Sequence, residues 1–316
     1  MQLKTRREGS ALHGLGVVVL KELSDHLTSA RMRVLEWLVV LTALAAVYAA
    51  ITQIREVTAQ DPFLFLRLFT TAREPLPSFV GFLSFLVPLM AIGLGFDAVN
   101  SEHNRRTLSR ILSQPIYRDA LLFGKFIAGL ATLSVSLIVL WLLLIGLGLI
   151  MLGVPPGGEE MARAFILLLV TIAYAGVWLA LAMLFSTLFR SAATAALVTL
   201  GLWLFLTVIW PALAPAIAEA VVPLEDQAAL ITTAQMLARL SPSTLFGECV
   251  LAILHPTTRT LGPVYLDQLQ GAVMGSPLPL WDSLMVAWPQ IVGLIAATIL
   301  LFVGGYVAFQ RQEVRA

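Results

Sequence analysis

Hydrophobic positions along the chain gather into six long runs that short polar connections separate. About 20 apolar residues in an α-helix cross the roughly 30 Å hydrocarbon core of a bilayer, and each run reaches that length. The third and fifth runs are longer, which predicts tilting, kinking or extension beyond the bilayer. The pattern therefore predicts an all-α polytopic membrane protein, with a single six-helix transmembrane domain over 35–309 and spans at roughly 35–54, 79–99, 121–153, 164–188, 192–222 and 284–309.

The N-terminal segment 1–34 contains a predicted amphipathic helix. Residues 14–33 place apolar side chains every four residues, which puts them on one face of a helix. Lys21 and Glu22 lie elsewhere on the same helical wheel. An amphipathic helix of this kind lies in the headgroup plane with its apolar face down. We therefore predict an interfacial helix whose apolar face is formed by Leu15, Val19, Leu23 and Leu27.

The stretch after the fourth run contains a predicted helix break and further short helices. Pro211 and Pro215 lie near the end of the fifth run, and because proline lacks the backbone donor we predict that this helix breaks before it leaves the membrane. In the extracytoplasmic segment 223–283, Ser241 and Pro242 are typical of a helix start. The apolar stretch that follows is too short to span, which predicts a re-entrant or extracytoplasmic helix over 242–254, between spans five and six.

Basic residues are distributed unequally between the two sides of the predicted membrane. With the N-terminus inside, the inner segments contain 14 Lys and Arg residues and the outer segments contain six. Cytoplasmic loops carry the excess of Lys and Arg. We therefore predict a bacterial or archaeal cytoplasmic-membrane protein, with its N-terminus and its tail 310–316 in the cytoplasm.

Composition changes the picture mainly by what it excludes. The chain is 59% hydrophobic and 12% charged, against about 25% charged residues in soluble domains. Its net charge of +1 and the lack of a long basic block offer no site for nucleic acid. We find no GxxxxGKS or GxxxxGKT phosphate loop, no metal-ligand spacing and no nucleophile motif. We therefore expect no catalytic residue, metal or cofactor on this chain.

The apolar runs contain few ionisable groups. Ion-coupled carriers place carboxylates or histidines at membrane depth, so this scarcity argues against such a carrier. Asp97 is the one acidic residue that we identify at the edge of a span, and we expect it to pair with a basic residue of the loop that follows. Energy for any work would then come from a partner protein.

The densest set of charges lies in the stretch 96–125, between the second and third runs. Residues 107–113 predict a short amphipathic helix with Leu108, Ile111 and Leu112 on one side, and Pro115 ends it. We interpret 100–120 as a cytoplasmic loop that receives force from a soluble protein. The plainer alternative is a solvated inner loop that obeys the positive-inside rule.

This stretch also resembles a known family. The run is FDAVNSEHNRRTLSRILSQPIYRDALLFGKFIAGL, and it is similar to the coupling-helix segment of ABC type-2 exporter permeases. The opening VVVLKELSDHLTSARM resembles their N-terminal interfacial helix, and LSPSTLF at 240–246 resembles a motif before their last span. The likeness covers nearly the whole chain and is strongest to the NosY-like branch, that of the nitrous-oxide-reductase maturation permease. The usual glycine in the middle of the loop is replaced here by Asn104, Arg105 and Arg106, which makes the loop more basic.

The resemblance implies a permease subunit of an ATP-binding-cassette exporter, which is not an enzyme by itself. Two copies of this chain would assemble with two separate ATPase subunits, which bind ATP and Mg. The permeases would contact membrane lipid, and an extracytoplasmic accessory protein is a further implied partner. The residues that the resemblance assigns to the interfacial helix are Lys21 and Glu22. Those that it assigns to ATPase docking are Glu102, Arg105, Arg106, Thr107, Leu108, Arg110, Ile111, Leu112, Pro115 and Arg118.

Two other function classes stay open at this point. One is an ATPase-independent secondary carrier or channel. The other is a membrane scaffold of an ATPase-driven maturation or extraction system that acts on a protein at the outer face. The residues do not identify a transported substrate.

Overall fold

The computed structural model describes residues 14–56, 63–104, 117–223, 225–261 and 277–311. Within these ranges the protein is built from helices, and no strand is assigned. In this described part of the chain, six helices are long and apolar enough to cross a membrane, which confirms the predicted all-α polytopic class. They are α2 (Ala30–Glu56), α4 (Phe79–Gly95), α7 (Arg118–Leu152), α8 (Gly158–Leu188), the run of α9 (Ala192–Leu204), η2 (Phe205–Ile209) and α10 (Trp210–Val221), and α14 (Leu280–Arg311).

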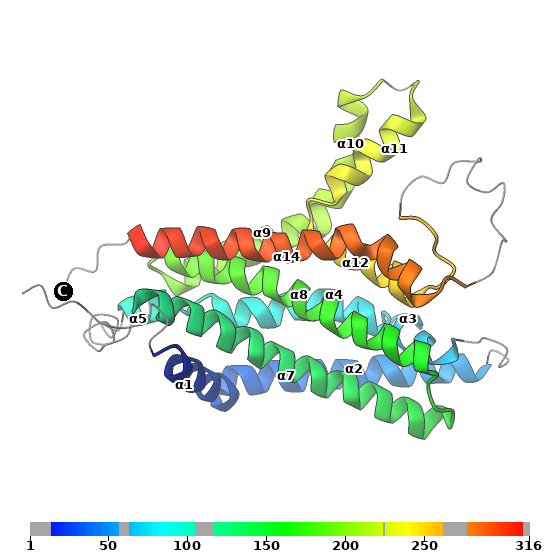
Figure 1. The fold of residues 1–316 in the computed structure, drawn as a ribbon, viewed down its shortest axis with the longest axis horizontal. Helices are drawn as coiled ribbons and strands as arrows, with labels where there is room; N and C mark the ends of the chain where they lie inside the picture. Colours follow the sequence, from blue (N-terminus) through cyan, green and yellow to red (C-terminus); the bar gives the residue numbers. More distant parts are fainter. Residues whose placement is uncertain (1–13, 57–62, 105–116, 224, 262–276, 312–316) are drawn as a thin grey trace, which may run out of the picture.

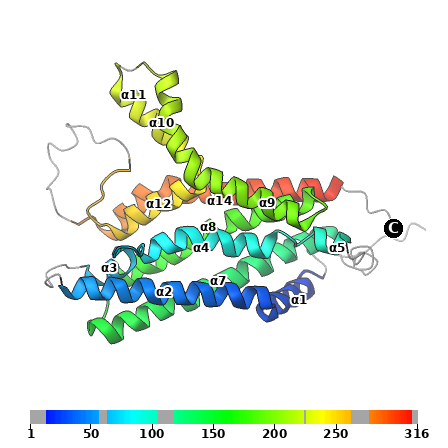
Figure 2. The ribbon, with the colours of Figure 1, turned by 180° about the vertical axis from the view of Figure 1, so that it is seen from behind.

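Six further helices of the described ranges are short and lie at the ends or the side of the bundle. At one end lie α1 (Leu15–Thr28), α5 (Asn100–Asn104) and the C-terminal end of α14 (Figures 1 and 2). At the opposite end lie η1 (Leu64–Leu66) and α3 (Arg67–Thr70). The pair α11 (Gln227–Ala238) and α12 (Pro242–Leu254) lies on the side of the bundle that α9 and α14 form.

The central helix of the bundle is α8. In its most apolar 18-residue window 72% of the residues are buried, and it packs against α4, α7, α12 and α14. The crossing with α4 depends on a small residue, since a Cβ at Gly95 would lie only 2.7 Å from the Cβ of Ala182. Small residues allow helix backbones to approach closely in a membrane, where dispersion contacts replace the hydrophobic effect.

The fifth span corrects one prediction. Helical structure continues over Ala192–Val221, so the two prolines do not end the helix. Instead Phe205–Ile209 forms a π-helical turn that ends two residues before Pro211. A π turn shifts the hydrogen-bond register by one residue, which accommodates a proline that has no N–H to donate.

Beyond the π turn, α10 leaves the bundle and forms a projecting hairpin with α11 (Figures 1 and 2). The indole Nε1 of Trp210 donates to the carbonyl of Leu237 at 2.7 Å and ties the two helices together. Between α11 and α12 the chain bends by 110°. This is the geometry of a broken span or a re-entrant loop, in keeping with the predicted short helices.

The helix predicted over 242–254 is present with those bounds as α12. Pro242 occupies its first turn as expected, but Ser241 makes no side-chain capping bond. Its hydroxyl is buried and has no hydrogen-bond partner among the described residues. The sequence therefore predicted the position of the helix start correctly and the capping contact wrongly.

The N-terminal helix is present as α1, but with a different buried face. Val18 and Glu22 are its buried residues, whereas Leu27, on the predicted face, is 42% exposed. The reason lies on α7, where Gly124 has no side chain: a Cβ there would lie 2.6 Å from a methyl carbon of Val18. The contact with α7 therefore sets the rotation of α1. Ser29 then separates the helices, since its hydroxyl accepts from the backbone N–H of Met32 at 3.1 Å as α2 begins.

Candidate functional site at the junction of α1, α5 and α7

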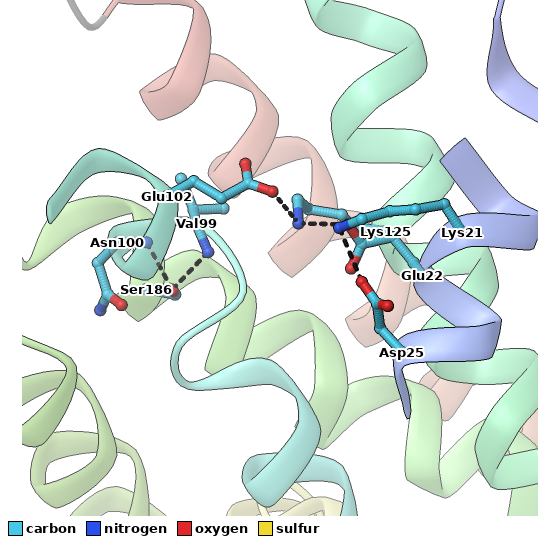
Figure 3. A network of polar contacts seen from close by, with 8 residues as sticks. All are labelled: Lys21, Glu22, Asp25, Val99, Asn100, Glu102, Lys125 and Ser186. Atoms are coloured by element: carbon cyan, nitrogen blue, oxygen red, sulfur yellow. Dashed lines mark hydrogen bonds and ion pairs between the residues drawn. The ribbon is translucent and has the colours of Figure 1, made fainter. Parts of the chain in front are cut away.

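The buried side chain of Lys125 joins three elements at one end of the bundle. Lys125 lies two turns into α7, and its side chain is 6% exposed. Its Nζ lies 2.9 Å from Oε1 of Glu22 on α1 and 2.7 Å from Oε1 of Glu102 on α5. Figure 3 shows the ammonium group between the two carboxylates. We call Glu22, Glu102 and Lys125 the junction triad.

A second lysine extends the triad along α1. Lys21 Nζ lies 2.9 Å from the carboxylate of Glu22 and 2.9 Å from that of Asp25 (Figure 3). Lys21 and Asp25 are largely exposed, whereas Glu22 and Lys125 are buried. An exposed pair contributes little to stability. A buried pair is different, because removal of one partner leaves an uncompensated charge.

The charges of this network shift the pKa values of Glu22 and Lys21. Burial by itself would raise the pKa of Glu22, but the charge of Lys125 and the hydrogen bonds from Lys21 and Lys125 lower it below its ordinary value. Burial opposes the charge of Lys21, but its hydrogen bonds with Glu22 and Asp25 raise the pKa of that lysine above the usual range. Glu22 and Lys21 are therefore both ionised at neutral pH.

The start of α5 is anchored to the end of α8. The hydroxyl oxygen of Ser186 accepts from the backbone N–H groups of Val99 at 3.0 Å and Asn100 at 3.3 Å (Figure 3). The amide of Asn104 donates to the carbonyl of Arg190 at 2.9 Å. Because both ends of α5 are held in this way, a displacement of α5 also acts on α8 and on the α8–α9 connection.

A third contact joins α2 to the same region. Asp97, which was predicted to pair with a basic residue of the loop that follows, pairs with Arg31 of α2 at 2.9 Å. Arg105, Arg106 and Arg110 of that loop lie outside the described residues. The Arg31 guanidinium also lies 5.0 Å from the ring centroid of Phe96. Arg31 is close because α2 starts directly after α1, which is docked on α7.

Comparison with known proteins identifies the family. A model of the ABC-2 family transporter protein matches residues 17–314. The chain belongs to the ABC-2 transporter family. This confirms the resemblance seen in the sequence.

Two curated relatives of this ABC-2 chain are both named probable ABC transporter permease protein NosY. The protein from Pseudomonas aeruginosa strain PAO1 is 31% identical over 148 residues, which cover 45% of this chain and 52% of that protein. The protein from Stutzerimonas stutzeri is 29% identical over 122 residues, covering 39% of this chain and 41% of that protein. The chain spans about half the length of the first relative and less of the second.

The structure of this ABC-2 family member brings together three separate motif elements of the sequence. Glu22 comes from the KEL triplet, Glu102 from the SE pair and Lys125 from the GK pair. Glu22 lies on the buried face of α1 rather than among solvated residues. Of the other predicted site residues, Lys21 is described above and Arg118 begins α7. The remaining ones lie outside the described residues: Arg105, Arg106, Thr107, Leu108, Arg110, Ile111, Leu112 and Pro115.

Sequence reasoning counted Arg163 as an ordinary outer basic residue, but its side chain is fully buried at the other end of the bundle. Its guanidinium donates to the carbonyls of Ile253 at 2.8 Å and Leu278 at 2.6 Å. It also donates to the Ser283 hydroxyl at 3.1 Å and pairs with Glu159 at 2.8 Å. Arg163 therefore connects α8, α12 and the start of α14, and only tertiary structure reveals this role.

A second missed residue is Glu36, an acidic residue inside the first span. It lies within the apolar run 35–54, and its strongly hydrophobic neighbours give no local signal of a polar site. The spans therefore contain more ionisable groups than we predicted, since Glu36, Lys125 and Arg163 all lie in them. Lys125 and Arg163 have charged and hydrogen-bonding partners that account for their position.

Proposed function

We propose that this ABC-2 chain is the permease subunit of an ATP-binding-cassette exporter. In this proposal ATP and Mg bind to separate ATPase subunits, and the 100–120 loop docks on them. The junction triad is the observation that carries the proposal. It joins α1 and α5, the two elements next to the proposed docking loop, to the long transmembrane helix α7.

The triad suits the transmission of force. An ion pair in a buried setting holds its geometry, because separating the charges leaves each without a partner. A push on the 100–120 loop would move Glu102, and Glu102 would move Lys125 and the start of α7. The same motion would reach α8 through Ser186. Tyr306 of α14 donates to Asp119 at 2.9 Å, so the last span is joined to the start of α7 as well.

A second copy of the chain is part of the proposal. The projecting hairpin of α10 and α11 exposes large apolar side chains, among them Val221 at 74% and Met236 at 63%. Within α9–α10 only 17% of the most apolar window is buried. These side chains would be buried if the hairpin packed against a second copy of the permease. This supports an assembly of two permeases and two ATPases. Mass measurement of the purified complex in detergent should then show two copies of this chain.

Orientation in the membrane is proposed from the distribution of Lys and Arg, with both termini in the cytoplasm. Single cysteines at Asn104 and Val154 are expected to react with a membrane-impermeant maleimide from opposite sides. Both positions are exposed, and they lie in connections at the two ends of the bundle. Cys249 is fully buried, so the unaltered chain is the unlabelled control. Labelling of both cysteines from the same side would contradict the proposed topology.

Docking on the ATPase is expected to depend more on apolar side chains than on arginines. Truncating buried apolar anchors at an interface typically costs on the order of 2–4 kcal/mol, whereas a charge at the rim contributes about 0–1 kcal/mol. Ile111→Ala with Leu112→Ala should therefore abolish co-purification of the ATPase. Arg105→Ala with Arg106→Ala, the matched pair, should mainly change the salt dependence of assembly.

The measurement is the amount of co-purified ATPase and its turnover in liposomes at two salt concentrations. If the apolar pair has no effect and the arginine pair alone prevents assembly, the loop binds as a charged segment, and docking through apolar side chains is wrong. Transport by the purified chain without any ATPase would reject the exporter and favour a secondary carrier.

A further inference from the structure

A pocket lies between α2, α4 and α7, away from the junction triad. Its volume is about 360 Å³, within the range of small-molecule sites in proteins. Two polar side chains line it, Glu36 of α2 and Ser136 of α7. The rest of the wall is apolar and includes Trp37, Met90 and Val139. A single acidic group in an apolar pocket is a specific chemical arrangement, and the proposed exporter function does not use it.

The carboxylate of Glu36 is poorly supplied with hydrogen-bond donors. The Ser136 hydroxyl lies 3.2 Å from Oε1 of Glu36 and 3.1 Å from the carbonyl of Thr132. A serine hydroxyl has one proton to donate, so it serves one of these two acceptors at a time. Across the described residues no Lys, Arg or His forms an ion pair with Glu36, although Arg33 lies one turn earlier on α2.

The depth of Glu36 makes this shortage costly. Glu36 lies six residues after the start of α2, about 9 Å along the helix. Its contact Ser136 lies near the middle of the 35-residue α7. Ionisable side chains at such depth are expensive unless a partner compensates them, and they mark binding sites by default. The chain therefore presents a half-buried carboxylate with room beside it for a cation.

We propose that this pocket binds the ammonium group of a single-chain lipophilic amine that enters from the bilayer. A primary ammonium supplies three N–H donors and a positive charge, which is what the Glu36 carboxylate lacks. The hydrocarbon chain lies against the apolar wall. Trp37 lines the same pocket and is 66% exposed, and its ring face attracts cations. An alkyl alcohol offers no charge and an alkyl sulfate is repelled, so the site selects amines.

Quenching of Trp37 fluorescence by a brominated amine tests this directly. The full-length chain in phosphatidylcholine nanodiscs is titrated with 12-bromododecylamine, and 12-bromododecanol is the uncharged probe of equal length. The part of the quenching that is present in the unaltered chain and absent in Trp37→Phe comes from Trp37, and it therefore reports on the pocket. We expect this component to saturate with the amine and to rise without saturation with the alcohol, which only partitions into lipid.

Two variants and one control assign the site. Glu36→Gln keeps the shape and removes the charge, and it should weaken amine binding about tenfold or more, as expected for a charge-assisted hydrogen bond. Val139→Phe narrows the pocket from a side chain that is 51% exposed, and it should weaken binding while Glu36 is unchanged. Ser134→Ala is the matched control. Within the described part of the chain the Ser134 hydroxyl bonds to its own helix at Leu130, and Ser134 does not line the pocket, so this variant should bind the amine as the unaltered chain does.

Three results would overturn the proposal. They are equal saturation by the amine and the alcohol, an unchanged affinity in both Glu36→Gln and Val139→Phe, or a linear response to the amine in the unaltered chain. The site stands or falls independently of ATPase coupling, since the readout is binding to this chain alone.

Discussion

Replacing Lys125 with alanine is expected to destabilise the folded chain by about 3–5 kcal/mol, because it removes one partner from a buried ion pair. Glu22 and Glu102 would then face each other at the α1–α5–α7 junction without the cation that lies 2.9 Å and 2.7 Å from them. Two carboxylates that shared one cation repel each other once it is removed, and burial keeps water from stabilising their charges. The measurement is thermal unfolding in nanodiscs, together with the mobility of a spin label at Gly16 of α1, where an added Cβ would meet no neighbour within 4 Å.

Two matched variants separate stability from force transmission. Lys21→Ala removes an ammonium group that is 57% exposed, and it should cost about 0–1 kcal/mol. The triple change Glu22→Gln, Glu102→Gln and Lys125→Met removes all three charges. It should restore most of the stability, because a neutral, well-packed replacement of a buried ion network is often nearly as stable. In the proposed exporter, the triple variant should still bind the ATPase but transport poorly. A Lys125→Ala variant as stable as the unaltered chain would show that the triad is not a structural joint.

Replacing Arg163 with methionine is the second change with a large expected effect, on the order of 3–5 kcal/mol. The fully buried guanidinium donates to the carbonyls of Ile253 and Leu278 and to the hydroxyl of Ser283. Without it, the Ile253 carbonyl and the Ser283 hydroxyl lose this donor in a buried setting, where an unpaired group costs about 1–3 kcal/mol. The Leu278 carbonyl, which is part-buried, loses its donor as well. The end of α12 and the start of α14 should separate from α8.

Limited proteolysis and thermal unfolding measure this effect. Cleavage near His255, which follows α12, is expected to accelerate in Arg163→Met. Arg163→Lys keeps the charge but loses the planar guanidinium that reaches several acceptors at once. Its thermal stability should therefore lie between that of Arg163→Met and that of the unaltered chain. Arg73→Ala is the control, because Arg73 is an exposed arginine that contacts the Thr52 hydroxyl. Equal stability of Arg163→Met and Arg73→Ala would contradict the role of Arg163.

Much of the fold was predictable because lipid imposes a simple requirement. A segment that crosses the bilayer must satisfy its backbone groups internally and present apolar side chains, so length and hydrophobicity are sufficient to find it. All six predicted spans are present. The short helix α12 was predicted at its observed bounds from a Ser-Pro start and the length of the apolar stretch that follows. Local chemistry also led to an error at Pro211, where a π turn absorbs the missing donor and the helix continues.

The candidate site was predictable only in its parts. Glu22, Glu102 and Lys125 each belong to a short motif that the sequence displays, but they are separated by about 80 and 23 positions along the chain and no local pattern joins them. The rotation of α1 shows why. A helical wheel of α1 favours the stripe Leu15, Val19, Leu23 and Leu27, whereas the fit of Val18 against Gly124 turns Glu22 inward.

The sequence by itself determined that this protein has six membrane-spanning helices, which family it belongs to and where its charged loop lies. These properties depend on local composition and on short motifs. They follow from how each segment interacts with lipid or water and with its neighbours in the chain, without knowledge of how the helices pack. Only the tertiary structure decided that Lys125 joins α1 to α5, that Arg163 holds α12 and α14 on α8, and that Glu36 opens into a pocket. In each case a polar side chain inside the bundle takes its partner from another helix, and the partner is set by how the helices pack rather than by the residues beside it in the chain.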